Sequence, residues 1–138
     1  MATLGRAGTC AVLALTWAAP VGAQRASARE AIRLQVQGFY RDDRDHRWPD
    51  VLDHFWVGKI SARWTAPTSD PAWVAARPID RDSACVTPNP QAVAVSIALI
   101  DDRWARVFVT RCAVPAPDDL WMLRVGQEWR IARLIRGS

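Results

Sequence analysis

The chain has 138 residues, half of them hydrophobic, and a formal net charge of +4 at pH 7. That hydrophobic content excludes a disordered chain, and the length fits one domain with a buried core. The basic residues are almost all arginine and are interleaved with aspartate, so the sequence has no basic stripe of the kind that nucleic-acid binding needs. We therefore expect no nucleic-acid partner. The sequence also contains no nucleophile elbow, phosphate loop or dinucleotide fingerprint.

The first 23 residues are predicted to be a signal peptide. Arg6 gives a basic start, residues 10–19 form a short apolar run, and residues 21–23 give a small-residue end. These are the three parts of a secretory signal peptide, and the run is shorter than the about 20 residues that span a bilayer. A buried N-terminal helix is the alternative. We predict cleavage near Ala23, a secreted or periplasmic location, and no membrane span in the mature chain. Because Arg6 is the only charged residue removed, the mature domain of residues 24–138 has a net charge of +3.

Cleavage also removes Cys10 and leaves Cys85 and Cys112 in an oxidising compartment. A disulfide between them would close a loop of about 28 residues and stabilise the fold by roughly 3–4 kcal/mol. Two separate buried thiols remain the alternative. Two cysteines and two histidines without a C-x-x-C spacing are weak grounds for a metal site. We expect neither a metal nor a cofactor.

The first half of the mature chain has mainly helical patterns. Ser27 and Glu30 fit a capping box at the start of an amphipathic segment. Pro49 suits the first turn of a short second helix, and Asp70 with Pro71 suits the start of a third. The predicted elements are helices over residues 27–43, 49–57 and 70–76, and a strand over residues 59–65.

The second half of the chain changes to a two-residue period, which is typical of strands. Two pairs of alternating segments surround short polar turns, and each pair predicts a hairpin. The predicted elements are a short extended piece over 83–87, strands over 93–99 and 104–112, a loop over 115–118, and strands over 120–125 and 129–136. Helices followed by an antiparallel meander indicate the α+β class.

Three segments give the chain a family resemblance: VQGFY at residues 36–40 before an acidic break, WPDVLDHF at 48–55, and LWMLRVGQEWRI at 120–131. With them the chain resembles the NTF2-like superfamily, which includes SnoaL-like polyketide cyclases and ketosteroid isomerase. The resemblance implies N-terminal helices packed in a strongly curved antiparallel sheet, a cone whose open end holds a ligand. It also makes a homodimer plausible. Members include enzymes and non-catalytic binders, so the fold does not give the activity.

We expect an exported domain whose cone binds a small apolar ligand or a protein partner without catalysis. Aromatic side chains with an N–H donor suit the mouth of such a cone, although they can equally fill the space between sheet and helices. The candidate ligand-binding residues are Trp56, Trp64, Trp104 and Trp121.

The alternative is a SnoaL-like or ketosteroid-isomerase-like enzyme that acts by proton transfer, as an isomerase, cyclase or dehydratase. Isomerases of the family use a carboxylate base with a tyrosine and a protonated acid as donors. Tyr40 would be the donor here, while Asp50 and His54, four residues apart on a helix, could meet as the acid–base pair. We prefer binding because the late strands offer no second buried carboxylate. A purely structural dimer with a filled cone is the third possibility.

Overall fold

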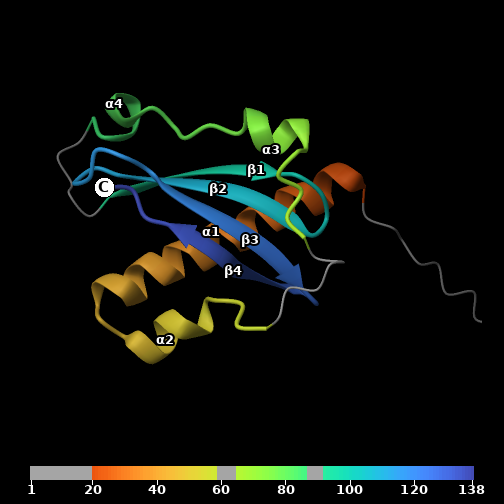
Figure 1. The fold of residues 1–138 in the computed structure, drawn as a ribbon, viewed down its shortest axis with the longest axis horizontal. Coiled ribbons are helices and arrows are strands. Elements are labelled where there is room, and N and C mark those ends of the chain that lie inside the picture. Colours follow the sequence, from red (N-terminus) through yellow and green to blue (C-terminus); the bar gives the residue numbers. More distant parts are fainter. Residues whose placement is uncertain (1–19, 59–64, 87–91) are drawn as a thin grey trace, which may run out of the picture.

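The computed structural model describes residues 20–58, 65–86 and 92–138 (Figure 1). Within these ranges, four helices precede four strands. The helices are α1 (Val21–Arg44), α2 (Trp48–Asp53), α3 (Pro71–Ala75) and α4 (Arg81–Ala84). The strands are β1 (Val93–Leu99), β2 (Trp104–Arg111), β3 (Asp118–Val125) and β4 (Glu128–Ile135). Most of the predicted signal peptide, most of the predicted strand over 59–65, and Trp64 lie outside the described residues.

The four strands form one open antiparallel sheet in the order β1-β2-β3-β4, so each strand pairs with the next one in the chain. The first hairpin pairs Leu99 with Ala105, and the second pairs Val125 with Glu128. Gly126 has φ +63° in the second turn, a left-handed conformation that glycine adopts without strain. The structure therefore confirms the α+β class and both predicted hairpins.

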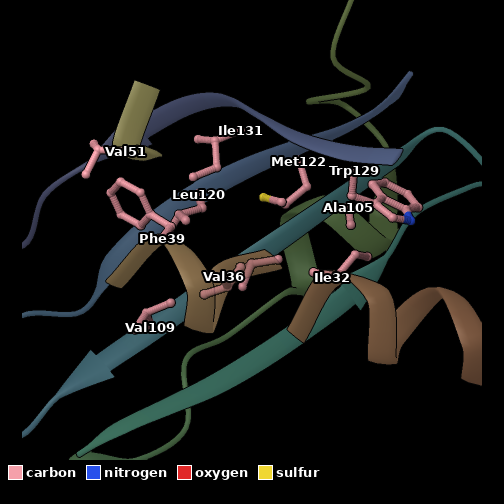
Figure 2. Packing of buried hydrophobic residues seen from close by; sticks show 11 residues of the cluster. Ile32, Val36, Phe39, Val51, Ala105, Val109, Leu120, Met122, Trp129 and Ile131 are labelled. Carbon is pink, nitrogen blue, oxygen red and sulfur yellow. The ribbon is translucent and has the colours of Figure 1, made fainter. Parts of the chain in front are cut away.

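Helix α1 packs along one face of the sheet, and its buried side chains Ile32, Val36 and Phe39 recur every three or four residues. Figure 2 shows these three side chains on the sheet-facing side of α1, with Phe39 beside Leu120 and Ile32 beside Ala105. Alternate strand positions face α1 because successive side chains of a strand point to opposite faces. The sheet contributes Ala105, Val107, Val109, Leu120, Met122, Trp129 and Ile131 to this core, and α2 contributes Val51. The space between α1 and the sheet is thus filled by side chains.

The opposite face of the sheet is covered by α3. Its one buried side chain, Trp73, packs edge-on against Trp104 and Trp121, with ring centroids 6.4 and 5.0 Å apart. Asp70 begins α3 by accepting a hydrogen bond from the Ala72 amide at 2.7 Å, as the sequence predicts. Each face of the sheet therefore has its own apolar cluster.

Several local predictions are wrong. The second helix, predicted over residues 49–57, is α2 and ends at Asp53. Helix α1 begins at Val21 behind Pro20, so Ser27 and Glu30 lie inside the helix and form no capping box. Residues 83 and 84, predicted as extended, belong to α4, whose N-cap Asp80 accepts a hydrogen bond from the Ser83 amide at 3.1 Å. At α1 an upstream residue begins the helix earlier than the pattern indicated, and at α4 a helix forms where the pattern indicated an extended piece.

The predicted disulfide is confirmed. Cys85, the C-cap of α4, is bonded to Cys112, which follows β2, and their Cα atoms are 5.6 Å apart. This bond ties α4 to the edge of the turn between β2 and β3. Among the described helices, none is long and apolar enough to cross a membrane.

Candidate functional site

The last turns of α1 meet the start of β3 through Tyr40 and Asp118. The Tyr40 hydroxyl donates to Asp118 Oδ2 at 2.5 Å, and the Asp118 side chain is fully buried. Burial raises the pKa of Tyr40 far above its ordinary value of 10.0, and the neighbouring Asp118 raises it further. The hydroxyl is therefore protonated at neutral pH and donates to Asp118.

The Asp118 carboxylate has partners on both oxygens. Oδ1 accepts from Arg111 Nη2 at 2.9 Å and from the Gly137 amide at 2.8 Å, and Arg136 Nη1 lies 3.4 Å from Oδ2. A buried carboxylate is tolerated only with such compensation. These contacts join the ends of α1, β2 and β4 around one buried charge.

An open cleft of about 350 Å³ lies beside this network, and we call it the α1 C-terminal cleft. The last two turns of α1 form one wall, and the start of β1 and the end of β2 form the other. Its lining residues are Gln37, Tyr40, Arg41, Asp43, Arg44, Val93, Arg111, Ala113, Val114 and Arg136.

A second cleft, of about 240 Å³, lies at the opposite end of α1. It is lined by the first two turns of the helix, the β1–β2 turn and Trp129. Val21 belongs to its lining and would be lost on cleavage near Ala23. The α1 C-terminal cleft, in contrast, consists entirely of residues in the predicted mature chain.

His54 follows α2 and contacts α1 through Asp42. His54 Nε2 lies 2.9 Å from Asp42 Oδ2, and Arg47 and Arg41 contact the other oxygen. The hydrogen bond with His54 lowers the pKa of Asp42 below its ordinary value of 3.8; burial opposes this shift, and the two arginines add to it. Gly38 permits this approach, because a Cβ there would stand 3.1 Å from His54 Cε1.

The His54 ring is largely enclosed, and its Nδ1 atom is buried without a hydrogen-bond partner among the described residues. The structure pairs His54 with Asp42 rather than with Asp50. Asp50 is half exposed and lies 3.6 Å from Arg47.

The three candidate tryptophans that the structure describes do not face α1. Trp104 and Trp121 lie on the far side of the sheet in contact with Trp73, and Trp56 packs against the same cluster. The tryptophan on the α1 side is Trp129, which is 4% exposed in the core. The tryptophans of the described ranges therefore do not form a common lining between helix and sheet.

Sequence reasoning missed Asp118, which it assigned to a loop. Because Asp118 is buried on β3, the expectation that the late strands carry no buried carboxylate is wrong. The signal was present in the alternation. Asp118 precedes Leu120 and Met122 at a two-residue spacing, so extending the strand by two residues places it on the α1 face. The partner pair Asp42 and His54, in contrast, has no local signal.

Comparisons of the chain with protein-family models, curated proteins and solved structures found no match. Function is therefore argued from the residues of the site.

Proposed function

We propose that the chain is an exported NTF2-like domain that binds a small, largely apolar ligand without catalysing a reaction. The packing of α1 and α2 against an antiparallel meander is compatible with part of the cone that the resemblance implies. The disulfide is compatible with an oxidising compartment.

The observation that carries the proposal is that the hydrogen-bonding groups of Tyr40 and Asp118 are paired with groups of the protein itself. A catalytic donor or base must reach a substrate atom. Tyr40 instead donates to Asp118, whose two oxygens are occupied by Arg111, Gly137 and Arg136. This pair favours a role in holding the end of the fold together.

The ligand is assigned to the α1 C-terminal cleft. The core between α1 and the sheet is filled, which leaves the clefts at the ends of that interface for a ligand. Val93, Ala113 and Val114 give the cleft apolar surface, and its volume is near the lower limit for small-molecule sites.

The proton-transfer enzyme is the second candidate, and the His54–Asp42 hydrogen bond is the observation in its favour. A histidine oriented by a carboxylate is a common general base. His54 Nδ1, the nitrogen that would take the proton, is buried beside Phe39, with ring centroids 6.0 Å apart. A substrate would have to displace this packing, which favours binding over catalysis.

Backbone amide NMR during titration with octan-1-ol and octanoate tests the proposal. We expect concentration-dependent shifts at Val93, Ala113 and Val114 with at least one probe. Ala113→Trp fills the cleft and should abolish the shifts, whereas Ala75→Trp, at an exposed position on α3, should leave them unchanged. Absence of shifts, or equal shifts in Ala113→Trp, would overturn the assignment. Amide shifts at Leu99, Ile100 and Asp101, which line the second cleft, without shifts at Val93, Ala113 and Val114 would place the ligand there instead.

A further inference from the structure

We infer that the ligand carries an anionic group, a carboxylate or a phosphate, and that this group binds Arg111 and Arg136 in the α1 C-terminal cleft. The inference rests on the proposed binding function and specifies its ligand class. It follows from how the charges are distributed between the surface of the cleft and the interior beneath it.

The charges that reach the cleft are mainly positive. Among the described residues that line it, four are arginines and one, Asp43, is an aspartate. The carboxylate that pairs with both Arg111 and Arg136 is Asp118, which is fully buried. The side chains of Arg111 and Arg136 are 24% and 39% exposed. The interior therefore holds the anion, while the two partly exposed arginine side chains line the cleft.

Both guanidinium groups are held in place before a ligand arrives. Arg111 Nη2 donates to Asp118 Oδ1 and to the Gly137 carbonyl, at 2.9 and 3.2 Å. Arg136 lies over the Tyr40 ring, 5.6 Å from its centroid, and donates to Asp43 at 2.8 Å. A guanidinium carries five N–H donors, so these contacts leave donors for a planar anion. Fixing a binding group in advance reduces the entropy lost on association.

Two features oppose an anion here. The C-terminal end of α1 carries the negative end of the helix dipole, and Asp43 competes for Arg136. Arg41 and Arg44 stand on the same wall of the cleft and are 61% and 49% exposed. Asp45 contacts Arg44 at 3.2 Å as an exposed pair that contributes little, whereas the carboxylate 3.4 Å from Arg41 belongs to the buried Asp42. The two outer arginines therefore counter the dipole and Asp43.

The neutral part of the ligand has a place as well. Val93, Ala113 and Val114 provide the apolar surface beside the arginines. A short apolar body with one anionic end matches this cleft better than a neutral apolar molecule of the same size, because an arginine fork binds carboxylate and phosphate with two parallel hydrogen bonds.

The test compares probes that share one alkyl chain: octanoate, octyl phosphate, octan-1-ol and octylamine, titrated into the mature protein and followed by amide NMR. We expect octanoate or octyl phosphate to bind about tenfold more tightly than octan-1-ol, with the amine weakest. Raising the salt concentration should weaken the anions and leave the alcohol unchanged. The ratio between the two anions identifies the preferred group.

Arg111→Lys keeps the charge beside Asp118 but removes the planar fork, and it should weaken anion binding roughly three- to tenfold without changing the affinity for octan-1-ol. Arg44→Gln, at an exposed position, tests the charge of the wall if Arg111→Lys does not fold. Arg33→Gln removes the same charge from the exposed side of α1 and should have no effect. Equal affinities for alcohol and acid, or anion binding unaffected by both Arg111→Lys and Arg44→Gln, would overturn the inference and leave the binding function standing. No binding of any probe would overturn both.

Discussion

Tyr40 and Asp118 join the C-terminal half of α1 to the first residue of β3 through a 2.5 Å hydrogen bond. The two residues are 78 positions apart in the chain. Arg111 and Gly137 bind the other oxygen of the same carboxylate. One buried charge therefore contacts residues at the ends of a helix and three strands. The stability of this end of the molecule should depend on that arrangement more than on any apolar contact there.

Tyr40→Phe should lower the free energy of unfolding by about 1.5–3 kcal/mol, because it removes a hydrogen bond to a buried charge and leaves Asp118 Oδ2 with only the longer contact to Arg136. Urea denaturation measures the change. Thr110→Val is the matched control, since it removes a neutral hydroxyl bond to the Ile79 carbonyl and should cost about 1 kcal/mol. Equal losses in the two variants would contradict a special role for the Asp118 charge.

The same pair predicts how the protein responds to alkali. Tyr40 is the single tyrosine of the chain, so tyrosinate absorbance near 295 nm reports on it alone. Its pKa is raised in the folded state, which means that the folded protein keeps the proton after the unfolded chain has lost it. The associated stability is complete below pH 10.0 and is lost progressively above it. We expect tyrosinate to appear together with unfolding; a titration near pH 10 with far-UV circular dichroism unchanged would contradict this.

Asp42 predicts the response to acid. Its pKa is lowered in the folded state, mainly by the hydrogen bond with His54, so its contribution is present above pH 3.8 and is lost as the pH falls through the lowered value. Asp42→Asn should make unfolding free energy less dependent on pH below 4 than in the unmodified protein. Asp50→Asn, at a half-exposed position beside Arg47, should leave the acid limb unchanged. If only Asp50→Asn made the free energy of unfolding less dependent on pH below 4, the acid response would belong to Asp50 and not to Asp42.

His54→Gln tests whether the hydrogen bond with His54 causes the lowered pKa of Asp42. If His54 is the main reason for the low pKa of Asp42, NMR titration of the Asp42 carboxyl should show its pKa rising toward 3.8 in this variant. The two arginines remain and should hold part of the shift. An unchanged pKa would assign the effect to Arg41 and Arg47 instead.

Local patterns in the sequence were sufficient to predict most of the fold. The alternation over residues 93–99 gives β1 with its observed bounds, and Asp70 with Pro71 gives the start of α3. Both depend on neighbours within a few residues, where spacing and turn chemistry act directly. The predicted capping box at Ser27 is wrong because the helix begins upstream at Val21, with Pro20 as its N-cap.

The site was harder to predict because its contacts join distant segments. Tyr40 was selected as a donor, but its partner Asp118 lies on the other half of the chain and follows Pro117, which favoured a loop. His54 was matched to Asp50 on the same helix, whereas the fold brings it to Asp42 on α1. Helical spacing identifies residues that can meet on one helix, and it carries no information on which face another helix will approach.

Gly137 closes the network at its C-terminal side, and its substitution tests whether the backbone contributes as the structure indicates. A Cβ at this position would stand 2.1 Å from the Ala116 carbonyl oxygen, so Gly137→Ala must move the segment that donates to Asp118 and accepts from Arg111. We expect a loss of about 2 kcal/mol in urea denaturation, comparable with one hydrogen bond to a charged group. Ser138→Ala, at the next and exposed position, should change stability by less than about 0.5 kcal/mol. A neutral Gly137→Ala would mean that Arg111 and Tyr40 alone are sufficient to hold Asp118, since the amide would then contribute nothing measurable.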